Sequence, residues 1–302
     1  MSEFIQLLSD NSENIYFVEG ERNGRYPYSN SLLIEDCLID TGISSRHLRK
    51  LKRKFSIKKV LFTHWHEDHI SGHRILKDVE MHCHINDKPL IENFKDLYKK
   101  YYCMINTPVE NLFDDIFETM RLEKAKIHQI LEHNQIININ NNSKIQVIHT
   151  PGHSAGHCCF LELNSKICFL GDIDFSSFGP WYAGLDSNLS DFEESILRLK
   201  QYDINTAITS HKGIFSGSKL IKEELDKFKS FFDIRDQKIL SHFSEKKAKN
   251  VNELIKQNII YKFYGEFKEY DVLAEKIMIK MHIDKLLKNK LIEQQKDGYI
   301  LK

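Results

Sequence analysis

One stretch of the sequence decides how the remainder is interpreted: Lys59-Val60-Leu61-Phe62-Thr63-His64-Trp65-His66-Glu67-Asp68-His69. Its first part, Val60 to Phe62, is an apolar run that predicts a short β-strand. Four potential metal ligands follow this strand within six residues. Because they lie on a strand-to-helix turn, their side chains can converge on a point, with His64 and His66 facing one metal ion and Asp68 and His69 a second.

Three further motifs contain the same residue types, and each follows an apolar run typical of a strand. They are Thr150-Pro151-Gly152-His153-Ser154-Ala155-Gly156-His157, Leu170-Gly171-Asp172-Ile173-Asp174 and Ser210-His211-Lys212-Gly213. In a layered α/β protein the loops at strand ends lie along one rim of the sheets. The order, spacing and context of the motifs therefore predict that they meet at one site.

The organisation of the chain around these motifs predicts an α/β fold. Short strands are expected at Ile15 to Val18, Ser31 to Ile34, Cys37 to Ile39, Ile145 to His149, Cys158 to Leu163, Ile167 to Leu170 and Ala207 to Thr209. Between the two groups of strands, residues 89–133 show widely spaced apolar residues among Lys, Glu and Asp, which predicts a helical insertion. A helix is expected from Asp191 to Lys200, and a turn at Asn140 to Asn142.

The last 70 residues differ from the rest. They predict a helix from Arg235 to Phe243, a second opened by Asn250 as N-cap, a long helix from about Asp271 to Lys288 and then a hairpin around a Lys-Asp-Gly turn. This pattern predicts a small winged-helix domain over residues 233–302, after a catalytic domain over 1–232. From Arg235 onward the chain has 15 basic and 10 acidic residues, so this part is mildly basic.

Composition excludes several classes of protein. The 302 residues are 41% hydrophobic and 28% charged, a profile typical of an ordered protein rather than a disordered one. Lys and Arg number 43, as do Asp and Glu, so there is no global attraction to nucleic acid or anionic membrane. The sequence has no apolar run of membrane-spanning length and no secretory signal at its start, which predicts a cytoplasmic protein without membrane contact.

Together the motifs resemble the metallo-β-lactamase fold superfamily, whose signature is HxHxDH followed by a distal His, an Asp and a final His. The match covers roughly residues 15 to 215 and fills every ligand position. The resemblance implies a four-layer αββα sandwich. It also implies the following metal ligands: His64, His66 and His153 for one ion, Asp68, His69 and His211 for the other, and Asp172 bridging the two. Asp40 matches a superfamily Asp that orients a ligand imidazole.

The resemblance also narrows the chemistry. Two Zn²⁺ ions are the expected cofactors, and Fe or Mn would suit the same mixed His/Asp donors. In the flavodiiron branch a glutamate replaces the second histidine of the motif, so His66 favours a hydrolytic site. The persulfide dioxygenase branch keeps HxHxDH with a single iron and stays open as a minor alternative. The segment Met281 to Ile292 is similar to the carboxy-terminal part of the lactamase-β-like group, which includes acyl-carrier-protein thioesterases and a single-stranded endoribonuclease.

We therefore expect a dinuclear-metal hydrolase. A metal-bridging hydroxide would attack the substrate while Asp68 accepts or relays the proton. The expected substrate is a small-molecule ester, thioester or lactone, held by the helical insertion and its aromatic residues, Phe94, Tyr98, Tyr101, Tyr102, Phe113 and Phe117. The alternative is a single-strand-specific endoribonuclease or phosphodiesterase that contacts nucleic acid through the C-terminal domain. A DNA-reading tail and a homodimer are left open.

Three other features have a structural and a functional interpretation. His157 is expected to cap or pack at a strand start, a place near the site is its alternative, and it is left out of the ligands. His82 and His84 alternate around Cys83, which predicts a solvated strand face. The loop from Gly179 to Gly184 follows Asp172 closely enough to line a pocket, or else serves only in packing.

Overall fold

The computed structural model describes residues 4–9, 14–139 and 143–302, and the turn expected at 140–142 lies outside them. Within the described residues, two large sheets form the centre of the molecule. The first has the order β1 (Ile5–Ser9), β2 (Ile15–Val18), β3 (Ser31–Ile34), β4 (Cys37–Ile39), β5 (Lys59–Leu61), β6 (Glu80–His84) and β7 (Gln129–Leu131). The second has the order β13 (Gly213–Ser216), β12 (Thr206–Thr209), β11 (Ile167–Phe169), β10 (Cys158–Glu162), β9 (Ser143–His149) and β8 (Ile136–Ile139).

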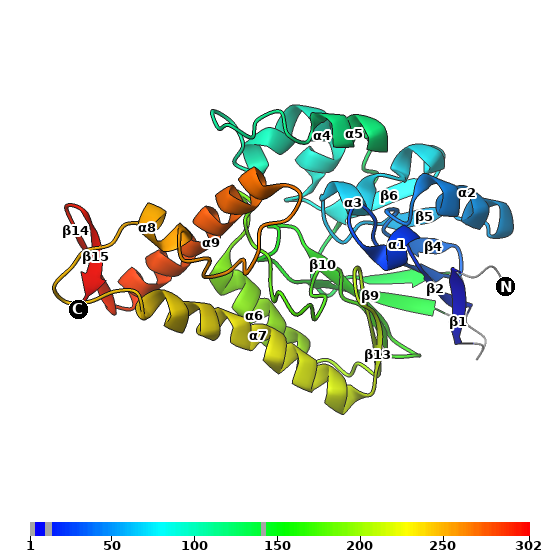
Figure 1. Ribbon diagram of the computed structural model, residues 1–302. Helices are drawn as coiled ribbons and strands as arrows, with labels where there is room; N and C mark the ends of the chain where they lie inside the picture. Colours follow the sequence, from blue (N-terminus) through cyan, green and yellow to red (C-terminus); the bar gives the residue numbers. More distant parts are fainter. Residues whose placement is uncertain (1–3, 10–13, 140–142) are drawn as a thin grey trace.

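Helices cover the outer face of each sheet (Figure 1). Those in the first half of the chain are α1 (Glu21–Gly24), α2 (Ser45–Lys54), α3 (Glu67–Ile70), the 3-10 helix η1 (His73–Leu76), α4 (Lys88–Tyr101) and α5 (Asp114–Met120). Those in the second half are α6 (Leu189–Leu199), α7 (Ser218–Leu240), α8 (Val251–Ile255) and α9 (Lys268–Lys288). A hairpin of β14 (Ile292–Gln295) and β15 (Gly298–Leu301) follows α9.

Alternation along the strands produces the layers, because successive side chains point to opposite faces of a sheet. Leu32 of β3 and Phe160 of β10 belong to the core between the two sheets. Their neighbours Leu33 and Leu161 face outward into two separate cores, one beneath the helices of each sheet. The central strands are therefore buried on both faces, and the fold is a four-layer αββα sandwich, as predicted.

The structure corrects the expected extent of the helical insertion. Residues 129–131 were expected within it, but they form β7, which pairs in parallel with β6. A strand of three residues is too short for its periodicity to be recognised. The helical part of the insertion consists of α4, α5 and the turns between them.

The C-terminal elements are partly as expected. Asn250 caps α8 through a capping box with Glu253, and the long helix and the hairpin are present. The helix expected to begin at Arg235 is instead the last part of α7, which begins at Ser218. The proposed boundary at 232/233 lies inside this helix, and α7 shares one core with α9. The winged-helix arrangement and the two-domain division stay predictions.

None of the helices in the described residues is long and apolar enough to cross a membrane.

Candidate metal centre

The ends of four strands bring the seven predicted ligands together. His64 and His66 follow β5, and Asp68 and His69 lie in the short helix α3. The other three follow β9, β11 and β12 respectively: His153, Asp172 and His211. A potential four-ligand group combines His64, His66, His153 and Asp172, and a potential three-ligand group combines Asp68, His69 and His211.

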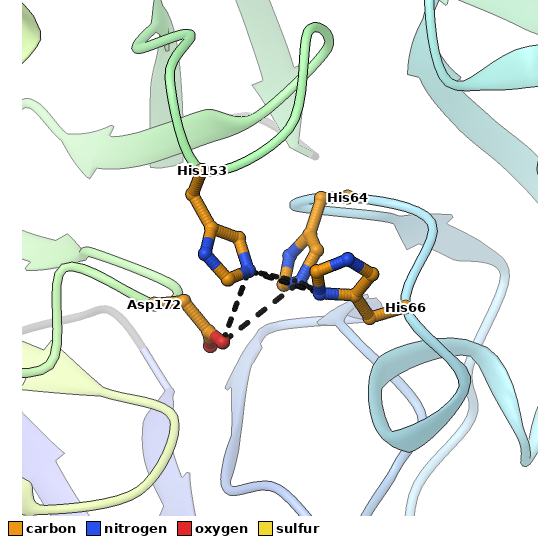
Figure 2. Close-up of side chains that lie close together, drawn as sticks. All are labelled: His64, His66, His153 and Asp172. Carbon is orange, nitrogen blue, oxygen red and sulfur yellow. Dashed lines mark hydrogen bonds and ion pairs between the residues drawn. The ribbon is translucent and has the colours of Figure 1, made fainter. Parts of the chain in front are cut away.

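In the first group, three imidazole nitrogens face one another (Figure 2). His66 Nδ1 lies 3.0 Å from His64 Nε2 and 2.9 Å from His153 Nε2. The two Nε2 atoms are 3.2 Å apart. Asp172 Oδ2 is 3.2 Å from His153 Nε2 and 3.9 Å from His64 Nε2. Three nitrogens and one carboxylate oxygen are therefore directed at one point.

The second group uses the other oxygen of the same carboxylate. Asp172 Oδ1 lies 3.1 Å from His69 Nε2 and 3.4 Å from His211 Nε2. Asp68 Oδ2 is 3.4 Å from His211 Nε2. Asp172 thus faces both groups, one oxygen to each, which is the position that a bridging ligand requires.

The polar atoms of this centre fit divalent metal ions. His69 Nε2 and Asp172 Oδ1 are buried and have no hydrogen-bond partner among the described residues. Buried polar atoms nearly always have a hydrogen bond, and these two atoms lie 3.1 Å apart without one, which fits a place for a positive ion beside them. Imidazole nitrogens and carboxylate oxygens are ligands that zinc accepts, and iron or manganese also accept them.

Hydrogen bonds on the far side of the rings fix how the imidazoles point. Asp40 Oδ2 is 2.8 Å from His69 Nδ1, and Thr63 donates to the same carboxylate through its backbone N–H and its hydroxyl. His153 Nδ1 lies 2.9 Å from the Trp181 carbonyl, and His211 Nδ1 2.6 Å from that of Gly24. Donation from each Nδ1 leaves the Nε2 lone pair directed into the centre. Asp40, at φ 59°, occupies the left-handed region.

His157 supports the centre from behind. Its Nε2 accepts the backbone N–H of Asp172 at 3.2 Å, and its Nδ1 lies 2.8 Å from the Thr150 hydroxyl. A Cβ at Gly171 would lie 2.4 Å from His157 Nε2, and Gly171 has φ +59°, so glycine is required there. His157 therefore positions the loop that carries Asp172.

The pKa shifts show which part of the centre attracts positive charge. Burial, then the neighbouring histidines, lowers the pKa of His64 well below its usual value, so its imidazole is neutral. Burial would lower the pKa of His211, but the Asp172 carboxylate outweighs it and raises the pKa to about 9. Burial would raise the pKa of Asp172, but His69, His211 and His153 hold it well below its usual value. The ionised carboxylates thus need positive charge in the second group.

The centre lies at the floor of a pocket of about 410 Å³. His66, Asp68, His153, Asp172 and His211 border the floor. The insertion contributes Tyr102, Met104, Phe113 and Phe117 to its walls, and the C-terminal segment contributes Tyr261, Phe267, Tyr270 and Asp271. Trp181 completes the aromatic walls, and the exposed cations Arg25 and Lys212 also line the pocket.

The structure corrects several predictions about residues near the metal centre. His82 is not on a solvated face but fully buried, because β6 lies inside the sheet with both faces covered. His84 is partly buried and stacks on His149, with ring centroids 3.9 Å apart. Of the aromatic residues expected in the lid, Phe94, Tyr98 and Tyr101 pack in or against the core instead of lining the pocket. The loop from Gly179 to Gly184 does both: Trp181 lines the pocket, and Tyr182 is buried.

The sequence did not indicate the contribution of the C-terminal segment to the pocket. Tyr261, Phe267 and Tyr270 lie about fifty residues or more beyond the last ligand motif, and no local pattern distinguishes them from core aromatics. Glu67 was also missed as a pocket residue, although it lies within the HxHxDH motif; it accepts hydrogen bonds from Tyr26 and Tyr102.

Comparison with known proteins agrees with this geometry. The sequence profile of the Metallo-beta-lactamase superfamily matches residues 26–211, which include all seven predicted ligands. The chain belongs to the metallo-beta-lactamase superfamily. Two solved structures are similar to this chain in fold over nearly its whole length. A beta-lactamase domain protein from Burkholderia ambifaria has a TM-score of 0.69 at 13% identity, covering 99% of this chain and 93% of that one.

A metallo-beta-lactamase family protein from Thermus thermophilus has a TM-score of 0.66 at 18% identity, covering 99% of this chain and 97% of that one. At such identities the likeness concerns the fold alone. Because both comparisons cover 99% of the chain, the likeness in fold extends beyond residue 211.

The curated relatives of this chain include proteins that are named thioesterases. An atrochrysone carboxyl ACP thioesterase from Pseudocercospora fijiensis is 23% identical over 85% of this chain and 61% of its own length. The human acyl-coenzyme A thioesterase MBLAC2 is 24% identical over 71% of this chain and 78% of its own length. The chain thus spans about three fifths of the fungal relative.

Proposed function

We propose that this protein is a hydrolase of acyl thioesters that holds two divalent metal ions, with zinc as our assignment. The observation that carries the proposal is the position of Asp172, whose two carboxylate oxygens face two histidine groups at the floor of an aromatic pocket. Membership of the superfamily and the thioesterase relatives support a hydrolase. When bound, such ions supply a hydroxide nucleophile near neutral pH and positive charge for the developing oxyanion.

The residues of the chain divide the remaining tasks. His64, His66 and His153 hold one ion, and Asp68, His69 and His211 hold the other, with Asp172 between them. Asp68 borders the pocket, where its carboxylate is placed to accept the proton released in hydrolysis. Asp40 and the Trp181 carbonyl keep the rings of His69 and His153 in orientation through their Nδ1 atoms.

The pocket favours a thioester over an ester or a lactone, which the same centre could also hydrolyse. Its aromatic walls suit an apolar acyl group, which stacks at low entropic cost. Arg25 and Lys212 line the same pocket and have no ion-pair partner among the described residues, so they are available to an anionic leaving group. Coenzyme A and the acyl-carrier-protein arm both combine a thiol with phosphate, which these cations are suited to contact.

The test is hydrolysis by the full-length protein of octanoyl-coenzyme A and phenylacetyl-coenzyme A, followed as released thiol. An aryl ester, an acyl-homoserine lactone and fluorescent single-stranded RNA are assayed in parallel, and metal content is measured by elemental analysis. We expect thiol release that a chelator abolishes and added zinc restores. Cleavage of RNA with no turnover of either thioester would overturn the proposal in favour of the endonuclease alternative.

The metal measurement tests a second part of the proposal. About two zinc ions per chain are expected from the two ligand groups. A single iron per chain, with oxygen consumption in the presence of a persulfide, would overturn the hydrolase and favour the dioxygenase. The matched control is Asp236→Asn, which changes a buried carboxylate outside the pocket and is expected to retain metal and thioester hydrolysis.

A further inference from the structure

Tyr270 differs from the other tyrosines of the pocket in its hydroxyl group. The hydroxyls of Tyr26 and Tyr102 both donate to Glu67, the first at 2.9 Å. The hydroxyl of Tyr261 accepts the indole N–H of Trp181 at 3.1 Å. The hydroxyl of Tyr270 is buried and has no hydrogen-bond partner among the described residues. A buried polar atom without a partner carries a free-energy cost, so its retention in the wall of a pocket indicates a ligand atom.

The ring of Tyr270 is held firmly. It packs edge-on against Phe113 with centroids 4.9 Å apart, and edge-on against Tyr102 at 6.1 Å. Both neighbours come from the insertion, whereas Tyr270 lies in the first turns of α9, which runs from the side of α4 and α5 toward the hairpin (Figure 1). A hydroxyl on a clamped ring has a fixed position, which is what recognition of one particular atom requires.

The contacts also place Tyr270 away from the reacting centre. The ring of Tyr102 stacks on the imidazole of His66 at 5.5 Å, and Trp181 contacts the same imidazole at 5.6 Å. Tyr102 and Trp181 therefore form the part of the wall next to the metal centre. Tyr270 contacts Tyr102 and lies one ring farther out. A substrate whose scissile carbonyl is at the centre would reach Tyr270 only with a more distant part of its acyl group.

The chemistry around this hydroxyl defines the atom that it would bind. Burial, then the charges of Tyr261 and Glu67, raises the pKa of Tyr270 well above its usual value, so the phenol stays neutral and keeps its proton. A neutral hydroxyl among aromatic side chains pairs with a neutral oxygen more readily than with an ionic group, because a charge would be poorly solvated there. The surrounding rings, Phe113 and Tyr102, require the remainder of the acyl group to be apolar.

The geometry points to Tyr270 as a specificity-determining residue, whose hydroxyl binds an oxygen substituent on an otherwise apolar acyl group, such as an aryl acyl group with a ring hydroxyl. This inference rests on the proposed thioester hydrolysis and adds the class of acyl group to it. It also gives the C-terminal segment a role in the catalytic pocket.

The experiment compares Tyr270→Phe with the wild-type protein on paired substrates. The substrates are the coenzyme A thioesters of phenylacetic acid and of its 2-, 3- and 4-hydroxy derivatives. We expect the variant to lose kcat/KM on at least one hydroxylated thioester about tenfold more than on the parent, which is the usual effect of removing one hydrogen bond. An equal loss on all four would place the hydroxyl at the scissile carbonyl and overturn the inference, as would no loss on any.

A binding measurement separates this inference from the proposed function. Calorimetric titration of the hydroxylated acid products should show weaker binding to Tyr270→Phe than to wild type, with the parent acid less affected. The control is Tyr98→Phe, which removes a hydroxyl that donates to Asp114 outside the pocket, and it should leave the substrate preference unchanged. Unchanged preference in Tyr270→Phe with continued thioester hydrolysis refutes only the inference. Absence of hydrolysis of all four thioesters by wild type refutes the proposed function itself.

Discussion

Among the described residues, the candidate metal centre and a second cluster both combine histidine with carboxylate side chains, and they differ in how their polar atoms are paired. In the candidate metal centre, His69 Nε2 and Asp172 Oδ1 have no hydrogen-bond partner among the described residues. The second cluster, the C-terminal polar network, has a partner for each polar atom of its histidine. It consists of Tyr182, Glu193, Arg235, Asp236, His282 and Lys285.

The C-terminal polar network has a consistent pattern of donors and acceptors. His282 Nδ1 lies 2.6 Å from Asp236 Oδ1, and its Nε2 lies 2.7 Å from the hydroxyl of Tyr182. Arg235 donates to that same hydroxyl and to the carbonyls of Phe178 and Pro180, so it holds the loop that carries Trp181. Composition alone does not separate the two clusters. Paired atoms indicate a structural role, and unpaired atoms that face each other indicate a bound ligand.

The largest effect is expected from Asp172→Asn. The amide removes the negative charge and one of the two oxygens that face the two ligand groups, so thioester hydrolysis should fall by at least about a thousandfold, or roughly 4 kcal/mol of transition-state stabilisation. Metal content, measured by elemental analysis, should fall with it. Turnover within tenfold of wild type would contradict the assignment of Asp172 to both metal ions.

Asp236→Asn is the matched change in the other cluster. The amide oxygen can still accept from His282 Nδ1, and Asp236 does not line the pocket, so metal content and kcat should stay close to wild type. Its ion pair with Lys285 is lost, so a reduced free energy of unfolding is expected.

Removal of metal should lower the unfolding free energy of the protein through the candidate metal centre and not through the C-terminal polar network. A ligand that binds only the folded state stabilises it by about 2.7 kcal/mol at one hundred times its dissociation constant, so a chelator should lower the unfolding free energy of wild type by about that amount or more. The loss should be much smaller in Asp172→Asn and unchanged in His282→Gln. Urea unfolding with and without chelator measures this; equal losses in wild type and Asp172→Asn would show that the centre does not bind stabilising metal.

Arg235→Met tests whether the C-terminal polar network is structural. Methionine retains most of the buried volume but leaves two carbonyls and the Tyr182 hydroxyl without their donor, a change that should cost about 2–3 kcal/mol in urea unfolding. Metal content per folded chain should change by much less than in Asp172→Asn, because Arg235 contacts no metal ligand and acts on the centre only through the loop that carries Trp181. A stability loss below about 0.5 kcal/mol would contradict the structural role.

The comparison of the two clusters also explains which parts of the fold and of the site could be predicted from the sequence. The meeting of the four motifs at one place could be predicted because each motif follows an apolar strand, and the structure brings their His and Asp side chains together. The division of these residues between two ions, and the place of Asp40 beside His69, were implied by the family resemblance and not by local pattern. The continuous α7 could not be predicted, because its apolar residues, including Phe228 and Phe232, are interspersed with charges over 23 residues.

Burial and pairing across the chain were beyond local patterns. The burial of His82 depends on β5 and β7 pairing on either side of β6, and the alternation around it resembles that of an exposed strand. Tyr270 lines the pocket only because α9 packs against the insertion. The partners of His282 come from α7 and from the loop after β11, 46 and 100 residues away, so the sequence alone did not separate a structural histidine from a ligand.

The smallest expected effect is a pH dependence specific to the C-terminal polar network. Burial, despite Asp236, lowers the pKa of His282 below its usual value of 6.5, with Arg235 and Lys285 contributing in the same direction. As pH falls below about 6.5, the unfolded chain therefore takes up a proton that the folded chain does not, and the free energy of unfolding falls.

The variant His282→Gln has no imidazole at this position, so its free energy of unfolding lacks this pH dependence. The excess stability of wild type over the variant should therefore be largest above pH 7. It should shrink toward pH 5 by at most about 1.4 kcal/mol per pH unit. The pKa of Asp236 is lowered, so its protonation affects stability only at lower pH. The other histidines are the same in both proteins, so their effects cancel when the two unfolding free energies are subtracted. Urea unfolding of both proteins in chelator from pH 7.5 to 5 measures the change; a difference that is constant or grows as pH falls would show that His282 is charged in the folded protein.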